Sequence, residues 1–137
     1  MKTTNINKLT NQKGFSLIEL LVVMVIIGML AALVGPRLFK QVDSAKQKDA
    51  YAQIAMLDEA LDLYRLDNHK YPTSEQGLKI LADYLKKELP LDPWGNPYVY
   101  INPGPDNRDF EIICYGADGQ AGGEGIDKDI INWKSLN

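Results

Sequence analysis

A long apolar run with one acid near its start most constrains what this chain can fold into. Phe15 to Gly35 make up 21 residues in which Glu19 is the only charged side chain. As a helix this segment spans about 31 Å at 1.5 Å per residue, enough to cross a bilayer core of about 30 Å. The run is longer than a signal peptide's apolar region. Composition therefore predicts a membrane anchor, with Lys13 on the cytoplasmic side.

Glu19 lies five residues into this run, where a carboxylate is costly. Insertion scales put the cost of a charge in hydrocarbon at about 2 to 4 kcal/mol, and such residues are functional by default. Two interpretations remain open from the residues alone. Glu19 is either solvated at the membrane edge, or it forms a buried ion pair with a positive group of another molecule.

Size, charge and cysteine content limit the remainder of the chain. Of 137 residues, about 100 remain outside the apolar run, which suits one small domain. The first fourteen residues carry three lysines and no acid, so the rest has a formal net charge of −6, which argues against a nucleic-acid partner. The single cysteine, Cys114, excludes an intramolecular disulfide, and its apolar neighbours favour a core thiol over a reactive one.

Beyond the apolar run the pattern predicts helix first and strands later. Apolar residues recur every three or four positions from Arg37 to about Asn68, which predicts an amphipathic helix that continues the membrane helix. A second short helix is expected from Thr73 or Ser74 to about Lys86. Two β-rich runs, "YVYI" and "FEIICY", are bracketed by turn formers and predict an antiparallel hairpin. Trp94 and Tyr98 are expected in the core.

An acidic, glycine-rich stretch follows the second run. "GADGQAGGEGIDKDIINW" holds Asp118, Glu124, Asp127 and Asp129 among five glycines. Carboxylates and carbonyls are the ligands of hard cations such as calcium, whereas zinc would need His or Cys nearby. The loop is not an EF-hand, because Asp129 stands where that motif closes with Glu. From the residues alone, a flexible acidic loop remains the alternative.

The junction "KGFSLIE" resembles the class III signal of type IV pilins and their relatives. The resemblance implies that a prepilin peptidase cuts between Gly14 and Phe15 and methylates the new amine of Phe15. It also implies that Glu19 pairs with the Phe15 amine of a neighbouring subunit, and that Pro36 belongs to the assembly helix. The expected organisation is then a leader at 1–14, a transmembrane and assembly helix at 15–36, and a periplasmic domain at 37–137. A simple helix boundary before Pro36 is the alternative at that residue.

Further stretches extend the resemblance over nearly the whole chain. "LDLYRLDNHKYPTSEQGL", "DPWGNPY", "GADG" and "DKDIINW" are similar to the major pseudopilin of the type II secretion system. The resemblance implies an α+β, type IV pilin-like fold with a long N-terminal helix on a small antiparallel sheet. It also implies one structural Ca²⁺ in the C-terminal loop, held by Asp118, Asp127, Asp129 and the main-chain carbonyl of Tyr115. The role of Glu124 stays open.

The function implied by the resemblance is that of a filament subunit, not an enzyme. Many copies would polymerise in the inner membrane of a Gram-negative bacterium and drive export of folded proteins. Implied partners are the chain itself, minor pseudopilins, an inner-membrane assembly platform and the prepilin peptidase, with no nucleic acid. The filament would be a periplasmic pseudopilus.

Three alternative functions compete with that of a major pseudopilin. A true type IV pilin is disfavoured because the usual paired C-terminal cysteines are missing. A tip-initiating minor pseudopilin is disfavoured because that subunit lacks the glutamate found here at position 19. Catalysis finds no support, since the lone His69 and Cys114 cannot supply a Ser/His/Asp or Cys/His set, and no phosphate-binding glycine loop follows a strand.

Overall fold

The computed structural model describes residues 13–135 and orders them as one long helix followed by short elements around a small sheet. Helix α1 covers Leu17–Asn68, the 3₁₀ helix η1 covers Leu78–Leu81, and helix α2 covers Ala82–Leu85. Strands β1 (Val99–Ile101) and β2 (Glu111–Cys114) follow, then the 3₁₀ helix η2 (Gly125–Asp127) and strand β3 (Ile130–Ile131). Contacts divide the chain into two units, Met1–Leu38 and Phe39–Asn137.

Helix α1 continues through Pro36, the residue at which a helix boundary was the alternative expectation. Pro36 lies inside the helix, so the alternative of a helix end before this proline is wrong. The two halves of α1 differ in where their apolar residues lie. Up to Val34 apolar residues occupy all faces of the helix, and in the C-terminal half they form one buried stripe. That stripe consists of Ala50, Ile54, Leu57, Ala60, Leu61 and Tyr64, and it faces the sheet of the second unit.

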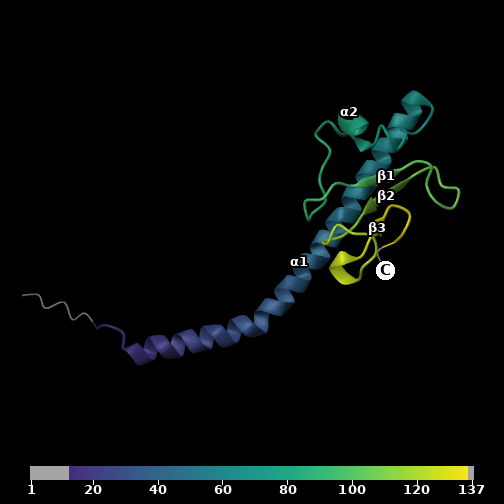
Figure 1. Ribbon diagram of the computed structural model, residues 1–137. Coiled ribbons are helices and arrows are strands. Elements are labelled where there is room, and N and C mark those ends of the chain that lie inside the picture. The colour runs from purple at the N-terminus through teal and green to yellow at the C-terminus, as the bar shows by residue number, and fades with distance from the viewer. Residues whose placement is uncertain (1–12, 136–137) are drawn as a thin grey trace, which may run out of the picture. The chain divides into compact units, whose positions relative to one another are not determined.

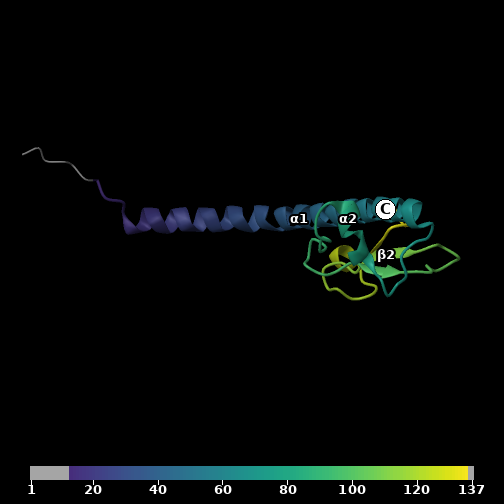
Figure 2. The ribbon, with the colours of Figure 1, turned by 90° about the horizontal axis from the view of Figure 1, so that it is seen from above.

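The sheet is three-stranded and antiparallel, in the order β1-β2-β3. Tyr100 pairs with Ile112 in the predicted hairpin, and Cys114 pairs with Ile130 across β2 and β3. Figures 1 and 2 show the strands lying along one side of the C-terminal half of α1. Helix and sheet therefore form two layers, and the core lies between them.

Among the described residues, the buried set is apolar apart from two acids, Asp92 and Glu111. Ile54, Leu57 and Leu61 of α1, together with Ile112 and Cys114 of β2, are at most 1% exposed. Burial of a Leu or Ile side chain contributes about 1.5 to 3 kcal/mol. Tyr98 is also buried and Trp94 packs against the core, as the sequence indicated.

The second helix begins later than predicted. The backbone N–H of Thr73 donates to Oε1 of Gln76 at 2.9 Å, and the backbone N–H of Gln76 donates to Oγ1 of Thr73 at 3.3 Å. These two bonds close a turn and not the first turn of a helix. Gly77 then adopts φ 61°, a left-handed conformation that interrupts the chain before Leu78. The helical segment ends at Leu85, close to the expected Lys86.

Candidate assembly and metal-binding sites

The N-terminal half of α1 exposes a continuous apolar surface. Within the first unit, large side chains from Phe15 to Leu38 are exposed by about half or more. By length and composition α1 can cross a membrane, and the other described residues bury none of its most apolar window. Because an exposed apolar surface of this size is unstable in water, this segment is covered by lipid or by other protein.

Glu19 takes part in a local contact that sequence reasoning missed. The backbone N–H of Ser16 donates to Oε2 of Glu19 at 3.1 Å, and the backbone N–H of Glu19 donates to Oγ of Ser16 at 3.2 Å. This reciprocal pair is a capping box at the start of α1, and its signature, Ser-x-x-Glu, is readable in "SLIE". The carboxylate thus has a partner within its own chain, and remains exposed to a second one.

The predicted cleavage point lies just outside the helix. Gly14 and Phe15 have no regular secondary structure and are exposed, and α1 begins only at Leu17. A peptidase could therefore reach this peptide bond without unwinding α1. The rest of the predicted leader, residues 1–12, lies outside the described residues.

The predicted metal loop lies at the other end of the sequence, between β2 and β3. The backbone N–H of Ala117 donates to the carbonyl of Ile126 at 3.0 Å and closes the loop at its base. The amide of Gln47, on α1, donates to the carbonyl of Gly125. These two contacts join the loop to itself and to the helix.

The side chains of the predicted ligands lie at different depths in the loop. Asp118 is exposed, and its Oδ1 accepts the nearby N–H of Gln120 at 3.0 Å. Asp127 and Asp129 are half-buried, while Glu124 is exposed. Among residues 13–135, no three His, Cys, Asp or Glu side chains converge closely enough to hold a metal ion. The three predicted aspartates are therefore close in sequence but are not gathered around one point.

Asp129 carries an unsatisfied oxygen that fits a cation. Its Oδ2 accepts the N–H of Gly122 at 2.9 Å, whereas its buried Oδ1 has no hydrogen-bond partner among the described residues. A buried polar atom without a partner costs about 1 to 3 kcal/mol. A hard cation would satisfy this oxygen, and the carboxylate and carbonyl groups of the loop are the donor set that calcium prefers.

Two glycines let the loop fold tightly against Asp127. A Cβ on Gly116 would lie 2.7 Å from the carbonyl carbon of Asp127, and a Cβ on Gly123 would lie 2.7 Å from its carbonyl oxygen. Both glycines also have positive φ, of 71° and 90°. Other residues cannot adopt this arrangement without displacing the backbone.

Strand β3 was not predicted, and it anchors the C-terminal end of the loop. Asn132 follows it; Oδ1 of Asn132 accepts the N–H of Ile112 at 3.0 Å, and its Nδ2 donates to Oδ1 of Asp58 on α1 at 3.2 Å. Burial raises the pKa of Asp58, and the bond from Asn132 partly opposes that rise. The signal in the sequence was the apolar pair Ile130–Ile131, too short to identify as a strand.

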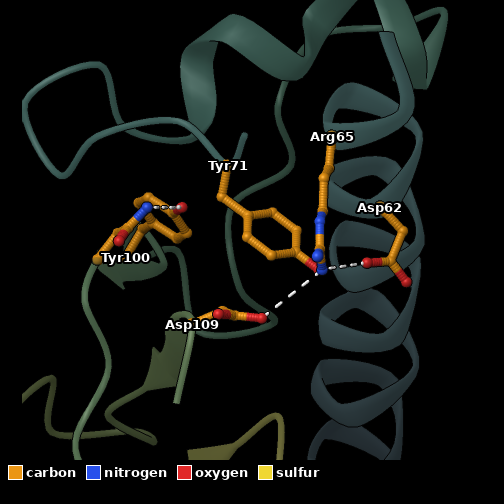
Figure 3. Close-up of polar contacts among 6 residues, drawn as sticks. Asp62, Arg65, Tyr71, Tyr100 and Asp109 are labelled. Carbon is orange, nitrogen blue, oxygen red and sulfur yellow. Dashed lines mark hydrogen bonds and ion pairs between the residues drawn. The ribbon is translucent and has the colours of Figure 1, made fainter. Parts of the chain in front are cut away.

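A polar cluster ties the hairpin loop to α1. The hydroxyl of Tyr71 donates to Oδ1 of Asp62 at 2.8 Å and accepts from Nη1 of Arg65 at 3.1 Å (Figure 3). Arg65 also lies 3.6 Å from Asp109 in an exposed ion pair, which contributes little by itself. Burial raises the pKa of Tyr71, so its hydroxyl stays a hydrogen-bond donor. These contacts join the hairpin loop, through Asp109, and Tyr71 to the C-terminal half of α1.

Cys114 is a core thiol, as its neighbours in the sequence indicated. It is 0% exposed, and burial raises its pKa to about 12. The thiol therefore stays protonated at neutral pH and is shielded from reagents.

A long helix with an exposed apolar half and a small sheet on its other half define a class of membrane-anchored, pilin-like filament subunits. Comparison with known sequences agrees: residues 37–133 match the family model "Type II secretion system (T2SS), protein G", and residues 9–35 match the "Prokaryotic N-terminal methylation motif". The chain belongs to the protein G family of the type II secretion system, whose members are pseudopilins.

Relatives with this name align along almost their full length. The type II secretion system core protein G of Vibrio cholerae is 44% identical, over 92% of this chain and 94% of the relative. The Pseudomonas aeruginosa protein is 46% identical, over 89% and 95%. Among solved structures, the major pseudopilin from the type 2 secretion system of enterohaemorrhagic Escherichia coli matches with a TM-score of 0.60 and 37% identity, over 72% of this chain and 95% of that one.

Proposed function

We propose that this pseudopilus subunit polymerises with copies of itself in the inner membrane, with residues 37–137 on the periplasmic side, and holds one structural Ca²⁺ in its C-terminal loop. The role is that of a building block and not of an enzyme. Minor pseudopilins, an inner-membrane assembly platform and the prepilin peptidase are the proposed partners. Membership of the secretion family supports the pseudopilus role, and the exposed apolar helix supports anchoring in the cell envelope.

The proposal of filament assembly rests on Glu19, an exposed acid at the N-terminal end of the apolar surface of α1. After cleavage at Gly14, the amine of Phe15 becomes a positive charge that a neighbouring Glu19 can neutralise. A buried carboxylate without a partner is strongly unfavourable, so loss of one partner from such a pair costs about 3 to 5 kcal/mol. The pair would therefore fix the axial position of each subunit against the next.

The assembly proposal is tested by cross-linking. A cysteine at Glu19 would remove the carboxylate of the pair, so the test places single cysteines at Ser16 and at Leu20 in separate copies. Cys114 is buried and does not interfere. Disulfide-linked dimers should form in membranes that contain the prepilin peptidase. They should be lost with Glu19→Gln, and their persistence in that variant would contradict the proposal.

The proposal of a calcium site rests on one observation: the buried Oδ1 of Asp129 has no hydrogen-bond partner within residues 13–135. Asp118, Asp127 and the carbonyl of Tyr115 would complete the protein ligands, and the ion would supply positive charge that holds the carboxylates together. Because Asp118 is exposed and directed at its own turn, binding by all three aspartates requires a change in the loop. Metal binding free energy then adds to the stability of the folded domain.

Isothermal titration of the full chain in detergent micelles, after treatment with a chelator, tests the metal site. We expect one calcium per chain, a loss of at least tenfold in affinity for Asp129→Asn, and no change for Glu88→Gln, an exposed acid outside the loop. Magnesium should bind more weakly, because it demands a tighter geometry. No heat of calcium binding to the unmutated chain would refute the site.

A further inference from the structure

Asp92 is a buried acid that neither the assembly site nor the metal loop uses. It begins the "DPWGNP" turn before β1 and is only 4% exposed. Within residues 13–135 the only ion pair joins Arg65 to Asp109, so Asp92 has no cationic partner there. A buried carboxylate is tolerated only when hydrogen bonds replace its water, which makes its partners informative.

Both oxygens of Asp92 are used, and each serves a different segment. Oδ1 accepts the backbone N–H of Trp94 at 2.9 Å and that of Asn96 at 2.8 Å, which closes the turn around the carboxylate. Oδ2 accepts from the thiol of Cys114, with the sulfur 3.3 Å away. The backbone N–H of Asp92 also donates to the carbonyl of Asn96 at 2.8 Å. Asp92 therefore fixes the turn internally and fastens it to the end of β2.

The two groups held by Asp92 flank the first segment of the metal loop. Cys114 is the last residue of β2 and directly precedes Tyr115, whose carbonyl is a proposed ligand. The side chain of Asn96 lies 3.3 Å from the point where a Cβ on Gly119 would be, next to Asp118. One buried carboxylate thus contacts Cys114 on one side of the segment that carries two proposed ligands, and on the other side it fixes the turn that places Asn96 beside Gly119.

We propose that Asp92, a residue outside the loop and not itself a ligand, is a positioning residue for the calcium site, acting through Cys114 and Asn96. This inference rests on the proposed metal site. Without the carboxylate, the turn no longer holds Asn96 against Gly119, and the thiol of Cys114 loses its acceptor. The segment from Tyr115 to Gly119 then gains freedom that calcium must remove on binding, so affinity falls.

The experiment measures calcium affinity and stability separately, on the full chain in detergent micelles. Asp92→Ala should weaken calcium binding by at least tenfold. Asp92→Asn should weaken it less, because the amide oxygen can still accept the two turn N–H groups and the amide nitrogen can approach the sulfur. Cys114→Ala should weaken binding, and Cys114→Ser, which keeps a donor, should restore part of the loss.

Leu81→Val is the matched control for stability. Leu81 lies in η1, is fully buried, and takes no part in the contacts of Asp92. The variant Leu81→Val should lower the urea midpoint of unfolding and leave calcium affinity within twofold of that of the unmutated chain. If Leu81→Val loses as much affinity as the Asp92 variants, affinity follows general stability and the positioning role is refuted.

The outcomes separate this proposal from the metal site itself. If the unmutated chain binds no calcium, the proposed metal site is wrong and the role of Asp92 falls with it. If the unmutated chain binds calcium and both Asp92→Asn and Cys114→Ala bind it equally well, only the positioning role is refuted. Should Asp92→Ala fail to fold, those two milder variants still decide the question.

Discussion

Gly116→Ala should destabilise the loop far more than an alanine at another glycine of the same loop. The residue has φ 71°, where a side chain costs about 1 to 2 kcal/mol. The new Cβ would also lie 2.7 to 2.8 Å from backbone atoms of Ile126 and Asp127, and overpacking of this kind costs about 1 to 3 kcal/mol. Because these neighbours are backbone and not flexible side chains, we expect a total loss of about 2 to 5 kcal/mol.

Gly122→Ala supplies the matched control. Gly122 has φ 93°, and a Cβ there would meet no atom of the described residues within 4 Å. Only the backbone cost should remain, about 1 to 2 kcal/mol. The difference between the two variants therefore isolates the close approach of Gly116 to Asp127.

Urea unfolding followed by tryptophan fluorescence measures this difference. The chain has two tryptophans, Trp94 and Trp133, and both lie in the second unit, so the signal reports on the domain and not on the apolar helix. The titration is run in detergent with chelator, so that metal does not contribute. Equal losses for the two alanine variants would refute the account of the loop's packing.

Other predictions concern the contacts that join the loop and hairpin to α1. Tyr71→Phe removes the hydroxyl that bridges Asp62 and Arg65, and it should lower stability by about 1 kcal/mol in urea; no change would mean that water replaces the bridge. Asp58→Asn should raise stability at pH 7, because burial raises the folded pKa of Asp58 above its unfolded value. The stability that comes from the raised pKa of Asp58 is present below the unfolded pKa of 3.8 and is lost as pH rises through the folded pKa. The advantage of Asp58→Asn should therefore vanish below about pH 3. An advantage that does not depend on pH would show that the raised pKa of Asp58 is not its cause.

The elements that repeat a simple pattern were predictable from the sequence. The buried stripe of α1 follows the helical period from Ala50 to Tyr64, and the hairpin follows from two β-rich runs between turn formers. The class III junction and the "DPWGNPY" stretch gave the family through resemblance, and the comparisons confirm it.

What escaped prediction depends on contacts between distant residues or on competing local signals. Strand β3 has two residues, and it exists because Cys114 and Ile113 of β2 offer it partners. The Thr73–Gln76 exchange has the residues of a helix cap, but Gly77 adopts a left-handed conformation that postpones the helix. The role of Asp92 requires Cys114 to lie beside it, 22 residues away in the chain, and no local pattern shows that.

A filament assay in the bacterium from which the gene comes tests most directly whether Glu19 is required for the chain to assemble into a pseudopilus. The gene is deleted and replaced by the unmutated chain, by Glu19→Gln, or by Glu59→Gln as an exposed control on α1. Cell-surface filaments are sheared after overexpression of the secretion genes, and secretion of a folded exoprotein is measured in parallel. We expect filaments and secretion with the unmutated chain and with Glu59→Gln, and neither with Glu19→Gln. Normal filaments with Glu19→Gln, or secretion that does not depend on the chain at all, would contradict this expectation.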